Sequence, residues 1–548
     1  MLWILCILAA VLKISLCAFQ YIYASPDLSP IDDTLMFDLA QSITAGNWLG
    51  EYDWLTLSKH SFFALWLALL NAIKMNVLVG GQLLFAGACF ALLAALKPAF
   101  KTNLARLWVF GITLFTPATW AEYSLRIYRD NIYPALVLYL IAGLLGAFLR
   151  YREAPKKAIP YYVIAGLAMG AAWLTHEDNA LLLPFIFCAC IVYLCFVFFT
   201  KHTKKEKITK AGLLLLPFLL WGLCIGAWSG MNYHHYGRFI VSDFTSSEFN
   251  DAMGAMSRVC IEDQQRYNLI PYSTRQKLYQ VSPTLKSIEP YLETGDMYNG
   301  YGSVETKEIN SGGIHWAIRK AAWLAGYYAD AQTSEDFYRR VSEEINDACE
   351  KGLLPAGPKR SGTFAVFKME YLKPTFQRFG EQMRIMAFFE QTRPTALLSI
   401  ARPDQSEAWE SYLHCTSTKA AVENMNTAYF PGLNQWAYRL LNFCTWVQRV
   451  VLWPMAVLSV LWVVRLIGDL RRGIKNKKLP ADLLDAILLL GVALTALLRM
   501  AAVAYLMAVS FSIPGYLMYL SAACPLALCF FAYASSRWLE KRLIKEDK

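Results

Sequence analysis

Charged residues are scarce in this chain, and their scarcity excludes an ordinary water-soluble domain. Asp, Glu, Lys and Arg make up only 17% of the 548 residues, whereas 56% are hydrophobic and the mean hydropathy is +0.32. Several apolar stretches approach the roughly 20 residues needed to cross the hydrocarbon core of a bilayer. The sequence therefore predicts an all-α polytopic membrane protein.

Acidic residues are fewer than basic ones, which leaves a formal net charge of +10. No nucleic-acid partner is predicted from this charge, because the basic residues lie in short clusters between hydrophobic runs, as cytoplasmic loops do. The sequence also lacks internal repeats and low-complexity tracts. Only a few of the thirteen cysteines lie in the large polar segment, and their spacing matches no zinc motif; they are Cys260, Cys349 and Cys415.

The N-terminal apolar run has no basic segment before it and no small-residue cleavage site after it. We therefore expect residues 2–20 to remain as a first span. Together with the other apolar runs this predicts ten spans. They are expected at residues 2–20, 76–96, 104–120, 132–149, 158–175, 180–200, 211–230, 443–468, 482–510 and 513–536.

The loops between these spans alternate between strongly basic loops and loops that are not strongly basic. With ten spans and both termini in the cytoplasm, every strongly basic connection faces the cytoplasm, as the positive-inside rule requires. The remaining loops then face outward, in a multi-pass protein of the plasma membrane. These outer loops are residues 21–75, 121–131, 176–179, 231–442 and 511–512.

Two short segments of the first outer loop are predicted to form helices that lie at the membrane surface. Residues 61–74 are apolar but, at about 14 residues, too short to cross a bilayer comfortably. Residues 33–46 have Asp33 near the N-cap and apolar side chains at helical spacing. Counting residues 61–74 as a span would place the basic loops on both sides of the membrane.

Three parts are predicted along the chain. Residues 1–230 form an N-terminal transmembrane module, 231–442 a mixed but helix-rich extracytoplasmic domain, and 443–548 the last three spans with a basic cytoplasmic tail. Within the domain, residues 333–350 show a helical pattern opened by Thr-Ser-Glu-Asp. The stretch 295–313 is rich in Gly, Ser and Asn and is predicted to be loop.

Ionisable side chains gather at the outer mouths of several spans. Such groups are costly near a bilayer unless they face water or a partner, so they are candidate functional residues. Arg499 belongs with them because it lies about 17 residues, or about 25 Å, from the cytoplasmic end of its span. A carboxylate in this group could activate a hydroxyl while cations hold an anionic head group. The candidates are Asp32, Asp33, Asp38, Lys59, His60, Glu122, Arg126, Arg129, Asp130, His176, Glu177, Asp178 and Arg499.

Segments in the first part of the chain resemble a known family in order and spacing. The motif that starts at Asp32, Asp-Asp-Thr-x-x-x-Asp-x-Ala, resembles the Asp-Glu-Thr-x-x-x-Glu-x-Ala signature after span one of GT-C superfamily glycosyltransferases. Residues 52–63 resemble a Lys/His-Pro-Pro segment, with Ser61 and Phe62 in place of the prolines. Residues 126–130 resemble the second acidic site. The likeness is closest to the protein O-mannosyltransferase and lipid A aminoarabinose-transferase branch, and covers about the first 230 residues.

The resemblance implies a GT-C fold and inverting transfer of a sugar from a polyprenyl-phosphate donor to a hydroxyl of a protein, lipid or cell-wall glycan. It implies that Asp32 is the general base, with Asp33 and Asp130 as further catalytic carboxylates. Lys59 matches a position associated with the donor phosphate, whose growing charge fixed cations would stabilise. The other substrate-binding candidates are His60, Arg126, Arg129, Glu177 and Arg499. No cofactor is required, although a divalent cation could bind at the acidic pair.

Simpler interpretations remain open for the same residues. Asp32 and Asp33 could only cap the following helix, and Lys59 could extend from the interface into water. Residues 126–130 could form a structural ion-pair cluster. Arg499 could pair with a buried carbonyl.

The alternative for the whole protein is a lipid-linked glycan transporter or flippase without catalytic activity. Such a protein should place charges near the membrane midplane and often contains a repeat. The charges of this chain gather on one side of the membrane and the sequence shows no repeat, which favours the transferase.

Overall fold

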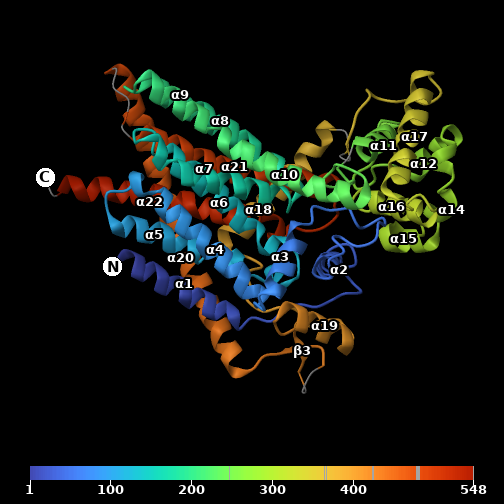
Figure 1. Cartoon of the computed structure of the whole chain (residues 1–548), viewed down its shortest axis with the longest axis horizontal. Helices are drawn as coiled ribbons and strands as arrows, with labels where there is room; N and C mark the ends of the chain where they lie inside the picture. The colour runs from blue at the N-terminus through green and yellow to red at the C-terminus, as the bar shows by residue number, and fades with distance from the viewer. Residues whose placement is uncertain are drawn as a thin grey trace.

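The computed structural model describes residues 1–548 except 246, 363–364, 366, 422–424, 477–479, 481 and 547–548, and gives the backbone alone for 247 and 541–546. The chain is mostly helical, as predicted. Its helices form an elongated bundle with a smaller helical domain at one end (Figure 1).

Within the described part of the chain, five helical segments are long and apolar enough to cross a membrane. Shorter apolar helices pack among them, so the structure fits the predicted multi-pass membrane protein. The long segments are α4 (Val77–Ala95), η6 (Glu177–Leu182) with α8 (Leu183–Phe199), α9 (Lys204–Leu213) with α10 (Leu215–Tyr236), α20 (Gly432–Lys475) and α21 (Leu483–Val509). The other helices at predicted spans are α1 (Leu2–Ala18), α5 (Asn103–Leu114), α6 (Tyr133–Phe148), α7 (Ile159–Trp173) and α22 (Ala523–Glu546).

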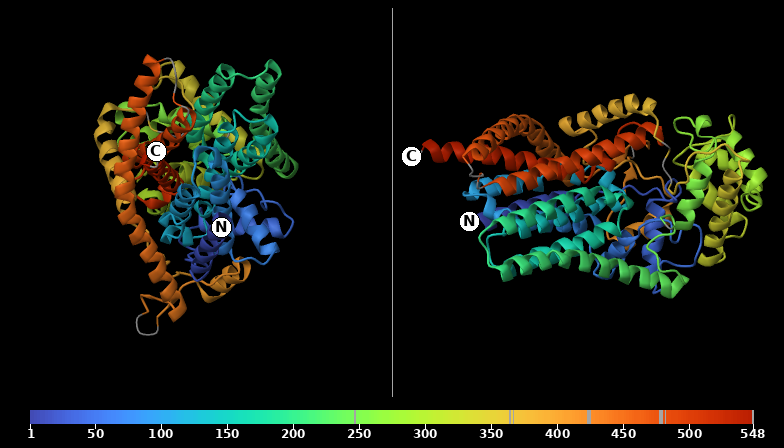
Figure 2. Two further views of the ribbon diagram at one scale, coloured as in Figure 1. Left: turned by 90° about the vertical axis from the view of Figure 1, so that its left-hand side faces the viewer. Right: turned by 90° about the horizontal axis from the view of Figure 1, so that it is seen from above.

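Both chain termini lie at the end of the bundle opposite the smaller domain (Figures 1 and 2). The basic connections meet at this same end. The Thr102 hydroxyl donates to Glu540 over 2.7 Å and so joins the start of α5 to the end of α22. The Lys210 ammonium donates to the Tyr151 carbonyl, which joins α9 to the α6–α7 connection.

The smaller domain, which we call the outer domain because it lies at the end of the bundle away from both termini, comprises the described residues of 243–354 and has a hydrophobic core of its own. Residues 333–350 lie in a helix, as predicted, whose N-cap Asp330 accepts the Thr333 amide. The prediction of a loop at 295–313 is wrong in part. The Thr294 side chain caps a short helix there, and a hairpin of two strands with two residues each follows. The elements are α11 (Ser247–Ser257), α12 (Tyr272–Val281), α13 (Pro283–Lys286), α14 (Glu289–Leu292), α15 (Gly295–Tyr301), β1 (Gly302–Ser303), β2 (Glu308–Ile309), α16 (Ile314–Leu324) and α17 (Ala331–Glu350).

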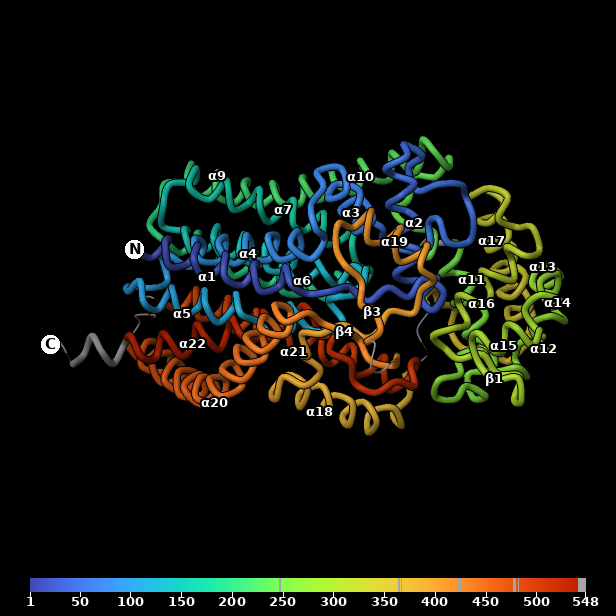
Figure 3. Tube along the Cα trace, turned by 90° about the horizontal axis from the view of Figure 1, so that it is seen from below, coloured from blue at the N-terminus to red at the C-terminus, as the bar shows by residue number. Residues whose placement is uncertain are grey.

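After the outer domain the chain returns to the bundle (Figure 3). Helix α18 (Leu372–Phe388) packs along α21, and α19 (Pro403–Leu413) packs on α3 (Phe62–Ala72). A short hairpin of β3 (Lys419–Ala420) and β4 (Ala428–Tyr429) leads into α20, which begins before the expected span. The polar segment 231–442 is thus divided between the outer domain and a covering of the bundle.

The last outer loop is longer than predicted. Helix α21 ends at Val509 and α22 begins at Ala523, so the expected two-residue loop at 511–512 is wrong. Pro514 explains the difference, because proline lacks an amide donor and disfavours helix in the residue before it. Gln391 holds this loop by donating to the Gly515 carbonyl over 2.8 Å and accepting the Leu517 amide over 2.9 Å.

Candidate functional site

The acidic pair lies at the start of α2 (Asp33–Thr44), one of the two short helices predicted in the first outer loop; the other is α3. Asp32 occupies the N-cap position, but its side chain makes no capping hydrogen bond. The Asp32 side chain is 36% exposed, whereas that of Asp33 is fully buried. Of the two neighbours, Asp32 alone is accessible to a ligand.

Asp33 holds an arginine next to Asp32. The Arg126 guanidinium donates to both Asp33 oxygens, over 3.0 Å from Nε and 2.6 Å from Nη2. This two-pronged geometry is the strongest form of an arginine–carboxylate contact. The same guanidinium lies 3.8 Å from Asp32. Asp33 therefore fixes the position of a positive charge beside the accessible carboxylate.

The loop that carries Lys59 is fixed at several points. The Asp53 carboxylate accepts the amides of Leu55 and Thr56, which closes a tight turn. Further along, the Leu57 carbonyl accepts the Asp243 amide over 3.0 Å. Lys59 thus leaves a backbone that is anchored on the outer domain.

The Lys59 ammonium lies between Asp32 and two aromatic rings. It forms an ion pair with Asp32 and donates to the Tyr128 hydroxyl over 3.1 Å. Its nitrogen also lies 5.1 Å from the centre of the Tyr128 ring and 5.4 Å from that of Trp316, which are cation–π distances. Lys59 is only 7% exposed, so it does not extend into water as the simple interface alternative would require.

A second ion pair lies next to the first. The Arg129 guanidinium contacts Glu177 over 2.7 Å and donates to the Thr175 carbonyl. Glu177 also accepts the His60 amide over 3.2 Å, and the His60 ring lies 2.6 Å from the Trp173 carbonyl through Nδ1. Arg129 and His60 are buried. These contacts join the 121–131 loop, the Lys59 loop and the α7–η6 connection.

Arg499 is buried in α21 and forms a third pair, with Asp178 at 2.7 Å. Its guanidinium also donates to the Tyr519 carbonyl over 3.1 Å and to the Tyr133 hydroxyl over 3.3 Å. Within the described residues no hydrogen bond or ion pair joins Arg499 directly to Asp32. Arg499 therefore belongs to a neighbouring pair and is not a direct partner of the accessible carboxylate.

Asp130 lies between these pairs and differs from the other carboxylates. It is buried and accepts the Ser521 hydroxyl over 2.9 Å. No ion pair to Asp130 is found in the described part of the chain. Ser521 comes from the long last outer loop, which also brings Tyr516 and Tyr519 to the site. Because the sequence predicted a two-residue loop, these three residues were not among the candidates.

The electrostatic surroundings of Asp32 favour its ionised form. Burial by itself would raise the pKa of Asp32, but the positive charges of Lys59, Arg126 and Arg129 outweigh this effect and hold the pKa below its usual range. Burial has the larger effect on Lys59 and lowers the pKa of its ammonium, although Asp32 opposes that change. Removing Lys59 from Asp32 would therefore make Asp32 more basic.

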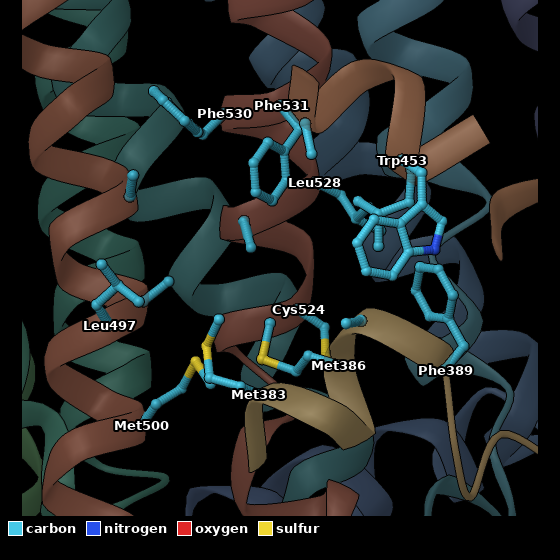
Figure 4. A pocket seen from close by; sticks show the side chains of 16 residues that line it. Met383, Met386, Phe389, Trp453, Leu497, Met500, Cys524, Leu528, Phe530 and Phe531 are labelled. Carbon is cyan, nitrogen blue, oxygen red and sulfur yellow. The ribbon is translucent and has the colours of Figure 1, made fainter. Parts of the chain in front are cut away.

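An apolar groove lies between α18, α20, α21 and α22. Figure 4 shows Met383, Met386 and Met500 gathered near Cys524 at one side, with Trp453 and other rings across from them. The groove holds about 340 Å³ and is lined almost entirely by apolar atoms. Its lining residue Met500 follows Arg499, and Cys524 lies three positions after Ser521. The groove and the cluster of charges are thus formed by neighbouring residues of α21 and of the segment around the start of α22.

The side chains of the site can also be compared with those that a metal ion needs as ligands. No group of three or more His, Cys, Asp or Glu side chains suited to a metal ion occurs in the described residues. The acidic pair instead faces Lys59 and Arg126. As arranged, the site is suited to bind an anion through the cations that surround Asp32.

Most of the residues that the sequence singled out are brought together, and several partners were missed. Asp32, Asp33, Lys59, His60, Arg126, Arg129, Glu177 and Arg499 lie in the connected pairs, with Asp130 among them. Asp38 lies exposed on α2, away from these contacts. Tyr128 stands inside the motif at 126–130 and could have been found there, whereas Trp316 follows only from the folded outer domain.

No family model matches the chain, and a search of curated proteins finds no match.

Proposed function

We propose that this chain is an integral-membrane inverting glycosyltransferase of the GT-C type, which transfers a sugar from a polyprenyl-phosphate donor to an acceptor hydroxyl outside the cytoplasm. The observation that carries the proposal is Asp32, a partly exposed carboxylate that pairs with Lys59 and lies 3.8 Å from Arg126. The motif around Asp32 and its likeness to the GT-C signature support the same conclusion.

In the proposed reaction, Asp32 takes the proton of the acceptor hydroxyl as the acceptor oxygen bonds to the anomeric carbon. The bond from that carbon to the phosphate oxygen breaks, and polyprenyl phosphate leaves with the electron pair. Lys59 and Arg126 lie where they can stabilise the charge that develops on the phosphate. No cofactor enters this scheme.

Lys59 is the cation best suited to change partners. Arg126, Arg129 and Arg499 each contact a carboxylate other than Asp32, at 2.6 to 2.7 Å. Lys59 is paired with the exposed Asp32 itself. When a donor phosphate takes over Lys59, Asp32 loses its closest positive charge and becomes a stronger base. Donor binding and base activation are then linked through one side chain.

The apolar groove between α18 and the α20–α22 helices offers a place for the donor's hydrocarbon chain. In the proposed complex the phosphate end of a polyprenyl chain leaves the groove on the side of Arg499 and Ser521, which are sequence neighbours of the lining residues Met500 and Cys524. Burial of apolar surface, at about 25 cal/mol per Å², would supply binding free energy that does not depend on the sugar.

The proposed orientation has ten spans, both termini in the cytoplasm and the site outside. The common position of the basic connections, opposite the outer domain, supports it. A membrane-impermeant thiol reagent applied to whole cells should label the partly exposed Cys349, whereas cysteines introduced at 154 and 475 should be protected. Labelling at 475 from outside would contradict the orientation.

Binding of a long-chain polyprenyl phosphate, the expected product, tests the function directly. Purified protein in nanodiscs should be stabilised against heat by polyprenyl phosphate and much less by the matching polyprenol, which lacks the phosphate. Mass spectrometry of surface glycans from cells with and without the protein should show the loss of one sugar. Equal stabilisation by both lipids, with unchanged glycans, would contradict the transferase and leave the transporter alternative to be tested by lipid translocation.

A further inference from the structure

The outer domain reaches into the candidate site through one side chain. Trp316 lies on α16, and its partly buried ring faces the Lys59 ammonium with the nitrogen 5.4 Å from the ring centre. Its neighbours are Phe244, at 5.2 Å between ring centres, and Trp54, at 6.4 Å. With Tyr128 on another side, two aromatic faces and one carboxylate surround the ammonium.

The position of Trp316 is fixed by a buried network one helical turn away. Arg319 is fully buried, forms an ion pair with Asp243 at 2.9 Å, and donates twice to the Trp54 carbonyl, over 3.0 and 2.6 Å. The Trp54 ring in turn lies within the core of the outer domain. The same helix therefore anchors the Lys59 loop and presents a ring to the Lys59 side chain.

An aromatic face at this position has a specific electrostatic effect. The ring quadrupole attracts a cation, and the attraction grows in the order Phe, Tyr, Trp. Lys59 lies away from bulk water, so the ring replaces part of the hydration that the ammonium has lost. An aliphatic side chain of similar size would fill the space without this effect.

We propose that Trp316 is a positioning residue contributed by the outer domain, which holds the Lys59 ammonium charged and aimed at the point where the donor phosphate binds. This inference rests on the proposed function. It gives the outer domain a direct part in the site.

Replacement of Trp316 by Tyr, Phe and Leu tests the inference. Affinity of the purified protein for polyprenyl phosphate should fall in that order, with a loss of about 2- to 30-fold in Trp316→Leu, as expected for removal of a partly desolvated cation–π contact. Turnover at saturating donor should change less than the KM for the donor. Equal losses in Trp316→Phe and Trp316→Leu, which differ in ring electrostatics more than in volume, would assign Trp316 to packing alone.

Trp323 provides the matched control. It lies on the same helix, contacts Trp54 from another side at 6.5 Å, and is 42% exposed. Trp323→Leu should leave polyprenyl phosphate affinity unchanged while affecting thermal stability about as much as Trp316→Leu. An equal loss of affinity in both variants would overturn the inference, because the effect would then belong to the helix as a whole.

A second measurement needs no lipid. Acylation of Lys59 by an amine reagent, followed by mass spectrometry, should be faster in Trp316→Leu than in wild type or Trp323→Leu, since the ring favours the unreactive charged form. Unchanged labelling would contradict the contact whatever the lipid does. If wild type binds no polyprenyl phosphate but the labelling changes, the contact is upheld and the proposed function fails.

Discussion

Two ion pairs, one in the outer domain and one in the candidate site, have similar chemistry but different access. Arg319 and Asp243 are 0% and 6% exposed, and the arginine also bonds to a backbone carbonyl. Lys59 is 7% exposed, but its partner Asp32 is 36% exposed. The first pair is closed on both sides, whereas the second is open on the carboxylate side.

This difference separates an anchor from a reactive group. A sealed pair cannot exchange partners without opening the core, so removal of one member leaves the other buried without the opposite charge that it had faced. A pair with one accessible carboxylate can admit a substrate and redistribute its charge. The predictions below break each pair in turn, beginning with the largest expected effect.

Asp32→Asn should lower the rate of sugar transfer by about 10² to 10⁴-fold, the usual cost of losing a general base. The amide is nearly isosteric with the carboxylate but cannot accept the acceptor's proton. Binding of polyprenyl phosphate should be retained, because Lys59 and Arg126 remain. The rate is measured with purified protein in single-turnover assays, and a rate near wild type would remove Asp32 from the role of base.

Arg319→Met should destabilise the protein by about 3–5 kcal/mol, since Asp243 would stay buried and keep the Tyr52 hydroxyl but lose the positive charge of Arg319. The double variant Arg319→Met with Asp243→Leu should recover part of this loss, because both charges are then gone. Chemical unfolding of detergent-solubilised protein measures the effect. No recovery in the double variant would mean that the bonds of Arg319 to the Trp54 carbonyl, and not the ion pair, carry the stability.

The sequence predicts the helical class and most residues of the site. Particular residues show which features of the site could not be predicted from it. Hydrophobic runs determine the positions of the long helices, and the charged mouths include Asp32, Lys59 and Arg499. Neither pattern indicates which charged residues pair with each other, because this depends on how the loops meet in the folded protein. Asp32 and Asp33 are equivalent in sequence, yet the turn into α2 buries one and exposes the other.

The missed residues share a physical reason. Ser521 and Tyr519 were assigned to a span because the stretch 513–536 is apolar, although Pro514 ends regular helix there. Trp316 lies about 257 positions from Lys59, so only the folding of the outer domain places it at the site. Periodicity reports local structure and carries no information on such long-range contacts.

Arg499→Lys should weaken polyprenyl phosphate binding by about 10-fold or more while the protein still folds. Lysine keeps the charge near Asp178 but cannot also bond to Tyr133 and the Tyr519 carbonyl in the planar geometry of arginine. The last outer loop, and Ser521 with it, would then be held less firmly against Asp130. Affinity is measured for wild type and variant side by side; equal affinity would make Arg499 a structural residue of α21.

The pH dependence of the rate tests the exchange of Lys59. In the free protein Lys59 and Arg126 hold the pKa of Asp32 below its usual range, so kcat/KM should stay constant until the pH drops below the usual range of an aspartate. In the donor complex Lys59 contacts the phosphate, the pKa of Asp32 rises, and kcat should fall at a higher pH than kcat/KM. In Lys59→Met both limbs should lie at the higher pH. If kcat and kcat/KM of the wild type fell at the same pH, the exchange of Lys59 would be contradicted.

Asp38→Asn should have the smallest effect and marks the boundary of the site. Asp38 belongs to the same motif as Asp32 and Asp33, but it lies exposed on α2, and no ion pair or hydrogen bond to it is found among the described residues. Because an exposed residue without contacts contributes little, transfer rate and stability should stay within about twofold, or ±0.5 kcal/mol, of wild type. The same single-turnover and unfolding assays are used, with Asp33→Asn as the paired comparison.

Asp33→Asn should reduce the rate clearly, since Arg126 would lose its two-pronged partner. If Asp38→Asn were the more damaging variant, the motif would act through the solvent face of α2, and the distinction between sealed and accessible carboxylates would not describe this site.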